Sequence, residues 1–139
     1  MNEPVRFSQV NIGDALPPLT MPPISRLTLA LYCGASGDHN PLHVDQDFAR
    51  EAGLGDVIAH GMLIMAYLGR TLTNWVPQPA IQTFGTRFLA MTRVGDAVTC
   101  TARITDKLAA AHAVRVTVEA RDQRGELKAA GDALIALPA

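Results

Sequence analysis

The chain has 139 residues, a length that fits a single domain. Hydrophobic residues make up 48% of it and charged residues 18%, which is a globular composition and argues against intrinsic disorder. The formal net charge is -1, so the sequence lacks the positive surplus typical of proteins that bind nucleic acid or anionic membranes.

Cysteine use and the apolar runs bear on where the protein works. Cys33 and Cys100 are the two cysteines, and neither belongs to a Cys-x-x-Cys motif, so we expect two buried thiols rather than a disulfide. Residues 1–10 lack the apolar stretch of a signal peptide. The longest apolar run, residues 62–68, is far shorter than the roughly 20 residues that cross a bilayer. The sequence therefore predicts a cytoplasmic protein without a membrane partner.

Residues 1–24 predict an irregular lead-in. We expect a short strand at residues 5–7 and a turn at residues 11–14, where Asn, Gly and Asp are turn formers. The proline pairs at 17–18 and 22–23 prevent a helix and favour extended chain.

Residues 25–76 predict three helices. Ser25 is a suitable N-cap for the first, which runs from about Arg26 to Cys33 or Gly34. Its apolar residues lie three or four apart and predict one core-facing side: Leu27, Ala30, Leu31 and Gly34.

The second helix is short and the third is strongly apolar. Residues 45–52 form the second, with Asp45 as its cap and Gly53 at its end. The third begins near Gly61 and continues to about Trp75, and its side chains are apolar almost all round. A helix with this composition is expected to be buried inside the protein.

The rest of the chain predicts antiparallel strands. Residues 98–105 and 114–121 alternate between apolar and polar side chains, which is typical of strands with one buried face. Residues 122–125 predict a hairpin turn that leads to a final strand at 127–137, and residues 81–92 form a further extended segment. Helices followed by a strand meander indicate an α+β fold in which the apolar sheet face curls around the third helix.

Residues 32–43 concentrate polar chemistry in a turn between two helices. Asp38 and His43 flank Pro41, so a turn and an extended step can direct both side chains to one point. A carboxylate and an imidazole around one water can orient it and move protons at neutral pH. Asn40 carries both donors and an acceptor, so it can fix either partner.

Two other interpretations of this segment stay open. In a purely structural one, Asp38 and Asn40 make local turns and His43 caps a helix. In the other, His39, His43, Asp45 and His60 supply metal ligands, although Pro41 disrupts the helical spacing of a paired-histidine zinc site. A calcium loop is disfavoured because Leu42 occupies the third ligand position.

Gly61 stands where the third helix begins. The first amides of a helix lack internal partners and carry partial positive charge, and glycine lets a substrate carbonyl approach them. Gly61 is therefore a candidate oxyanion donor, or alternatively a glycine that only permits a tight turn. His60 alone is typical of a structural histidine.

Two motifs together resemble the signature of the MaoC-like, R-specific enoyl-CoA hydratase (hydratase 2) family, which includes the catalytic subunits of dehydratase complexes. The resemblance covers most of the chain. It is carried by Ser36-Gly37-Asp38-x-Asn40-Pro41-x-His43 and by Ala59-His60-Gly61-Met62.

The resemblance implies a fold and a set of roles. The fold is the hot-dog fold, a long helix wrapped by an antiparallel sheet, over one domain of residues 1–139. Asp38 and His43 are implied as the catalytic dyad that binds the reacting water, Asn40 as a supporting residue, and Gly61 as the amide that binds the thioester carbonyl. The implied reaction is reversible hydration of trans-2-enoyl thioesters to (R)-3-hydroxyacyl thioesters, with no metal or cofactor.

The expected partners follow from the same resemblance. The substrate is an acyl-CoA or acyl-carrier-protein thioester, and the assembly is a homodimer or larger, or a heterodimer with a related subunit. A sheet with an uncovered edge also favours a second copy. Two alternative functions remain: a hot-dog acyl-CoA thioesterase, and a non-catalytic acyl-binding subunit of a dehydratase complex.

Overall fold

One antiparallel sheet and one central helix organise the protein. The computed structural model describes residues 3–139, and within them five strands lie in the order β1-β3-β4-β5-β2. The strands are β1 (Leu19–Thr20), β2 (Ile81–Phe88), β3 (Thr99–Leu108), β4 (Ala113–Arg121) and β5 (Leu127–Ala136). The α-helices are α1 (Arg26–Ser36), α2 (Gln46–Glu51) and α3 (Gly61–Thr73), and the short 3-10 turns are η1 (Phe7–Gln9), η2 (Pro41–His43), η3 (Gln78–Ala80) and η4 (Ala109–Ala111).

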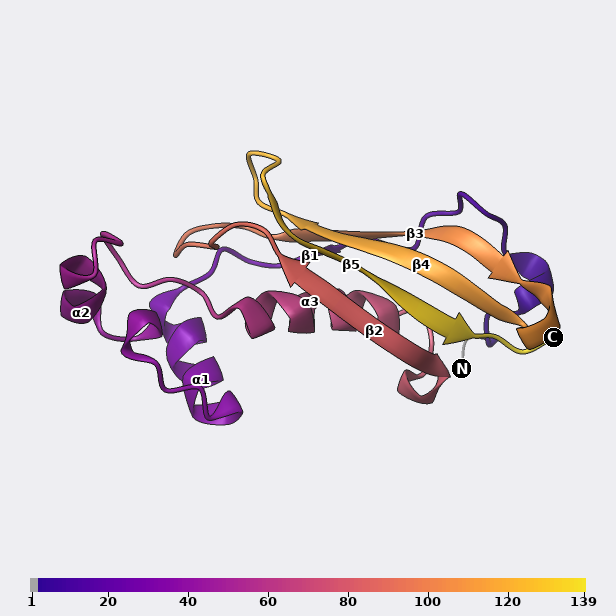
Figure 1. Cartoon of the computed structure of the whole chain (residues 1–139), viewed down its shortest axis with the longest axis horizontal. Helices are drawn as coiled ribbons and strands as arrows, with labels where there is room; N and C mark the ends of the chain where they lie inside the picture. Colours follow the sequence, from indigo (N-terminus) through magenta and orange to yellow (C-terminus); the bar gives the residue numbers. More distant parts are fainter. Residues whose placement is uncertain (1–2) are drawn as a thin grey trace.

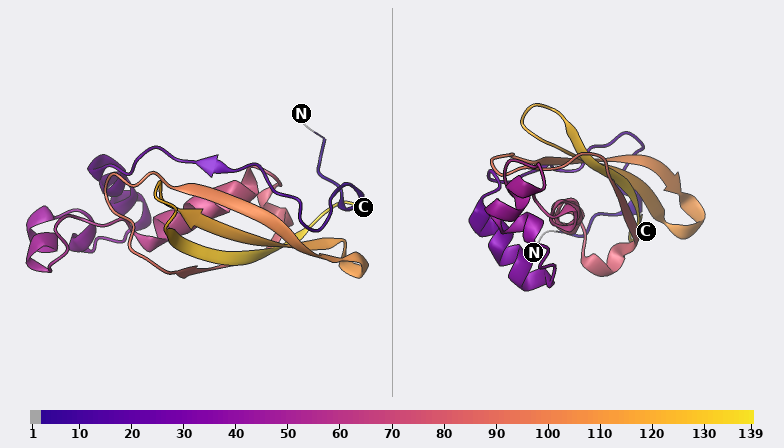
Figure 2. Two further views of the ribbon diagram at one scale, coloured as in Figure 1. Left: turned by 90° about the horizontal axis from the view of Figure 1, so that it is seen from above. Right: turned by 60° about the vertical axis from the view of Figure 1, so that its left-hand side comes forward.

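The sheet curves over α3, as the period-two patterns predict. In β4 the valines at 114, 116 and 118 are fully buried, whereas Arg115 and Thr117 between them are exposed. Figure 1 shows α3 beneath the strands, and the right-hand view of Figure 2 shows it end-on under the curved sheet. The predicted α+β architecture is confirmed.

The prediction that α3 is buried on every side is wrong. Leu68 and Leu72 are fully buried against the sheet, but the side chain of Met62 is 52% exposed and Ala66 and Arg70 are also exposed. A single sheet covers only one side of a helix, so the opposite face of α3 stays open (Figure 2).

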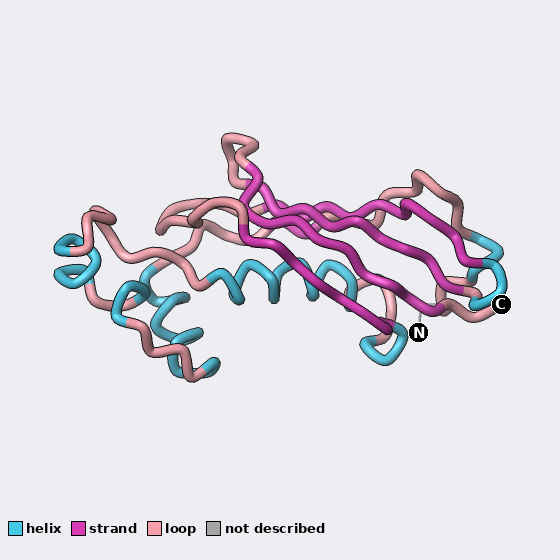
Figure 3. Tube along the Cα trace, in the orientation of Figure 1, coloured by secondary structure: helices cyan, strands magenta, loops and turns pink. Residues whose placement is uncertain are grey.

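The predicted core-facing side of α1 is also wrong. Leu27 and Leu31 are 68% and 66% exposed, and the helix instead buries Leu29 and Cys33. Figure 3 shows α1 and α2 beyond the end of the sheet, so the sheet does not cover the outer face of α1. Helical spacing identified an apolar face, but the position of the helix decides which face is covered.

The lead-in differs from prediction at one point. Residues 7–9 form the 3-10 turn η1 instead of part of a strand at residues 5–7, because the Gln9 side chain caps the Arg6 amide at 3.0 Å. The turn at residues 11–14 is confirmed by the 3.2 Å bond from the Asp14 amide to the Asn11 carbonyl. Residues 1 and 2 of the predicted lead-in lie outside the described residues.

Side-chain caps fix the ends of the helices that carry the candidate site. The hydroxyl of Ser25 accepts the Thr28 amide at the start of α1, and the Asp45 carboxylate accepts two amides at the start of α2, as their sequence positions predict. Both cysteines are buried free thiols. In residues 3–139, each helix is too short or too polar to cross a bilayer.

Candidate active site

The segment after α1 is shaped by turns that its own side chains make. Gly37 ends α1 in the left-handed conformation, with φ of 75°. The Asn40 amide then donates to Asp38 Oδ1 at 3.3 Å, and the Leu42 amide donates to Asn40 Oδ1 at 3.1 Å. These Asx turns lead the chain into η2, which ends at His43.

His43 is held by a backbone carbonyl. Its Nδ1 lies 2.7 Å from the Ile58 carbonyl oxygen, which can only accept, so Nδ1 carries the proton and Nε2 bears the free lone pair. That Nε2 lies 3.8 Å from Asp38 Oδ2. The His43 side chain is 12% exposed and that of Asp38 is 51% exposed. The imidazole is therefore mostly buried, and the carboxylate lies at the surface beside it.

When the His43 imidazole is unprotonated, it and the Asp38 carboxylate present two acceptors to each other. A carboxylate oxygen and an unprotonated imidazole nitrogen have no hydrogen to share, so they do not bond directly. A donor with two hydrogens between them satisfies both. The pair can therefore hold a small hydroxylic molecule and take a proton from it.

His60 joins three parts of the site. Its Nε2 donates to the Asp38 carbonyl at 3.2 Å, its ring stacks on His43 with centroids 3.8 Å apart, and Tyr32 packs edge-on against it at 4.8 Å. The residue is only 1% exposed. Burial is the main cause that lowers the pKa of His60, with the nearby His43 adding to it, so the ring is neutral at physiological pH.

Gly61 opens α3 directly after His60 and borders a cavity. Its amide is among the first helical N–H groups, which have no intrahelical acceptor. A Cβ at this position would lie 3.2–3.3 Å from the Phe88 ring, so that ring already rests on the Gly61 backbone. The cavity has a volume of about 390 Å³, and its lining includes His43, Ile58, Ala59, Gly61, Ile64, Phe88, Leu89, Ala90, Met91, Thr92 and Lys128.

Comparison with known proteins identifies the family. The family model described as the MaoC like domain matches residues 8–124. The chain belongs to the MaoC-like family. An (R)-specific enoyl-CoA hydratase of Rhodospirillum rubrum is 36% identical over 84 residues, which are 59% of this chain and 58% of that protein. The (R)-specific enoyl-CoA hydratase of Aeromonas caviae is 30% identical over 112 residues, 79% of this chain and 84% of that protein.

The shared fold extends beyond the aligned motifs. The unliganded R-hydratase PhaJ1 from Pseudomonas aeruginosa superposes with a TM-score of 0.86 at 26% identity, over 97% of this chain and 86% of that one. The MaoC-like chain therefore has the hot-dog fold that its motifs imply. The match spans 58% of the length of the R. rubrum relative. It spans 84% of the A. caviae hydratase and 86% of the PhaJ1 chain.

The metal interpretation is disfavoured by ring geometry. Asp38, His43 and His60 offer ligand atoms within 4.8 Å of one another. A metal ion lies in the plane of each imidazole that binds it, about 2.0–2.1 Å from nitrogen for zinc. The His43 and His60 planes are stacked and differ by only 24°, so their lone pairs run side by side instead of meeting at one point.

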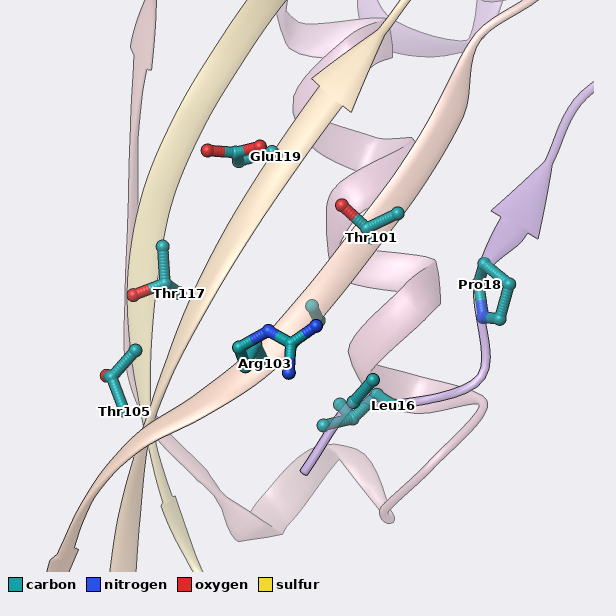
Figure 4. A pocket seen from close by; sticks show the side chains of 9 residues that line it. Leu16, Pro18, Thr101, Arg103, Thr105, Thr117 and Glu119 are labelled. Atoms are coloured by element: carbon teal, nitrogen blue, oxygen red, sulfur yellow. The ribbon is translucent and has the colours of Figure 1, made fainter. Parts of the chain in front are cut away.

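A second hollow lies on the outer face of the sheet and has different chemistry. Figure 4 shows threonines, Arg103 and Glu119 on β3 and β4, beside Leu16 and Pro18 of the lead-in, with α3 behind the strands. Its volume is about 450 Å³, but no histidine or aspartate is among the residues that line it. This hollow offers no acid–base pair comparable to Asp38 and His43.

The sequence located the main groups and missed their surroundings. Asp38 and His43 face each other as predicted, and Asn40 supports the same loop through its turn. Gly61 stands at the helix start on a cavity that His43 also lines. The contacts of His60 were not predicted, because ring stacking between residues 43 and 60 depends on tertiary structure. The wall at residues 88–92 was missed for the same reason.

The buried neutral His60 predicts a specific dependence of stability on pH. Its pKa is lowered in the folded state, so the unfolded chain binds a proton more readily below the ordinary value of about 6.5. Its contribution is complete above that pH and is lost as the pH falls. The unfolding free energy is measured by urea titration at each pH. Between pH 8 and pH 5 it should fall more steeply for the wild type than for His60→Gln. Equal slopes would show that His60 titrates normally.

Proposed function

We propose that this MaoC-like chain catalyses the reversible hydration of trans-2-enoyl thioesters to (R)-3-hydroxyacyl thioesters. The observation that carries the proposal is the acceptor pair of Asp38 and His43 Nε2, 3.8 Å apart, beside a cavity that also exposes the start of α3. The names of the R. rubrum and A. caviae relatives support both the reaction and the R configuration.

The reacting water is the molecule that fits between the two acceptors. One of its hydrogens points to Asp38 and the other to His43 Nε2, which leaves an oxygen lone pair free for the substrate. Because Nδ1 of His43 is bonded to the Ile58 carbonyl, Nε2 is the nitrogen that takes the proton.

In the proposed hydration, water adds across the C2=C3 double bond. The water oxygen bonds to C3 while His43 takes one of the water's protons. The C2=C3 electron pair then forms the C1=C2 bond, and the carbonyl pair moves onto the thioester oxygen to give an enolate. The Gly61 amide, at the positive end of α3, stabilises that oxygen. The proton then returns from the dyad to C2, so the net change is one added water. Dehydration reverses these steps.

Removal of either dyad group should stop the chemistry without unfolding the chain. Asp38→Asn and His43→Gln keep similar shapes and remove the charge or the base. We expect kcat for crotonyl-CoA hydration to fall by about 10²–10⁴-fold in each, the usual worth of acid–base catalysis. Loss of absorbance of the enoyl thioester measures the rate.

His39→Gln is the matched control, because His39 is an exposed imidazole of the same loop. It should keep the wild-type rate. Folded Asp38 and His43 variants with near-normal kcat would refute the dyad. Release of free thiol from crotonyl-CoA by the wild type would instead favour a thioesterase.

The Gly61 amide can be tested with a residue that has no backbone N–H. Proline is tolerated at the first position of a helix, and His60 already has the extended ψ of 133° that a following proline requires. Gly61→Pro removes the N–H donor. Gly61→Ala keeps the N–H donor and adds the same Cβ contact with Phe88. We expect kcat of the proline variant to lie about 10²–10³-fold below that of the alanine variant. Equal rates would exclude the amide as oxyanion donor.

We further propose that the chain acts as one domain and forms a homodimer through β2 and the open face of α3. β2 is the last strand in the sheet order, and a hollow lined partly by Ala66, Gly69, Ile81 and Phe84 lies between it and α3. Edge strands and apolar helix faces are usually covered in stable proteins.

We also propose a cytoplasmic location, which the two free thiols support.

Light scattering tests the assembly. The wild type should have about twice the chain mass of 14.8 kDa. Ala66→Glu places a charge on the open face of α3 and should give the single-chain mass, while Ala110→Glu in η4, at an exposed site away from this face, should not. A monomeric wild type contradicts the dimer.

A further inference from the structure

Lys128 is a buried cation that a strand irregularity directs inward. The pairing of β4 with β5 passes from Ala120 opposite Ala129 to Arg121 opposite Leu127, so Lys128 has no opposite residue. Such a bulge re-aims a side chain. Lys128 is 3% exposed and lines the cavity beside Gly61.

Three carboxylates surround the Lys128 ammonium group. Its Nζ lies 2.5 Å from Glu126 Oε1, 3.5 Å from Asp122 Oδ2 and 3.7 Å from Asp96 Oδ2. The Asp122 and Asp96 side chains are 0% and 5% exposed. Burial acts to raise the pKa of Asp122, but hydrogen bonds from the Glu126 and Arg124 amides and from the Arg124 side chain outweigh it and lower the pKa to about 2, so the carboxylate is charged.

The same lysine fixes the cavity wall at three points. Its Nζ donates to the Met91 carbonyl at 2.9 Å, and its own carbonyl accepts the amides of Leu89 and Ala90 at 2.9 and 3.3 Å. Asp96, its carboxylate partner, accepts the Arg93 amide at 2.8 Å. The segment from residue 89 to residue 93 is therefore tied to one buried charge cluster.

This wall in turn contacts the reacting end of the cavity. The Thr92 carbonyl accepts the Ala59 amide at 2.8 Å, two residues before Gly61. Phe88, directly before the pinned segment, rests its ring on Gly61. A shift of the wall would change the space beside the candidate thioester site.

The desolvation cost of burying these charges argues for a positioning role of the cluster over a stabilising one. Buried ion pairs are often no more stabilising than apolar residues of the same size, because desolvation offsets their attraction. A cluster with one favoured geometry can instead fix a backbone segment. We infer that Lys128 is a positioning residue that holds the wall of residues 88–92 and thereby sets discrimination between short and long acyl chains, an inference that rests on the proposed thioester substrate.

The test removes the charges and retains the shapes. Lys128→Met combined with Asp96→Asn and Asp122→Asn leaves no buried carboxylate without its cation, and the asparagine oxygens can still accept the backbone amides. Calorimetry then measures binding of butyryl-CoA and octanoyl-CoA, which cannot be hydrated. We expect the wild type to prefer octanoyl-CoA and the triple variant to lose about tenfold of that preference, the effect of a poorly packed methylene. The Ala59 amide should exchange with solvent faster.

Two further variants keep the outcome decisive. Glu126→Gln perturbs the exposed side of the cluster and should give a smaller loss of preference. Arg115→Met with Asp132→Asn removes an exposed ion pair on the outer sheet face and should change nothing. Equal weakening of both ligands by the triple variant, or a wild type that binds neither or both alike, overturns the inference. A wild type that discriminates by length but does not hydrate crotonyl-CoA refutes the proposed reaction alone.

Discussion

The hydrogen bond from His43 Nδ1 to the Ile58 carbonyl is the constraint on which the site depends. At 2.7 Å it fixes the tautomer, so the lone pair of Nε2 faces Asp38. The Ile58 amide also donates to the Leu42 carbonyl at 3.1 Å, so two hydrogen bonds hold residues 42–43 against Ile58. Because Ile58 precedes Gly61 by three residues, this clamp also joins the imidazole to the start of α3.

Backbone carbonyls orient both histidines, and this choice keeps charge out of the interior. The Asp38 carbonyl holds His60 in the way that the Ile58 carbonyl holds His43. A carboxylate in either place would stabilise a charged imidazole, whereas a carbonyl fixes the ring and adds no charge. The Asp38 carboxylate thus remains the negative group next to the imidazole pair. Lys128, which lines the same cavity, is instead surrounded by charged carboxylates.

Local patterns predicted the long strands, the helix caps and the turn motif because each depends on neighbours in sequence. Alternation predicted β3 and β4, and the turn residues between Asp38 and His43 predicted that the two side chains converge, as their 3.8 Å approach confirms. The exposed faces of α1 and α3 were mispredicted because periodicity shows that a face is apolar but cannot show what covers it. Lys128 escaped notice because a bulge, set by pairing between strands, turns a charged residue inward.

The open face of α3 and the accessibility of the site have one origin. A five-stranded sheet wraps one side of the helix, and Gly61 at the helix start stays partly exposed and borders the cavity. More sheet there would bury Met62 and Phe88, which are about half exposed, and would also close the cavity. A fold that encloses its central helix completely cannot offer the amides of that helix to a long substrate. The uncovered apolar surface therefore accompanies the position of Gly61, the proposed oxyanion donor, at the start of the core helix.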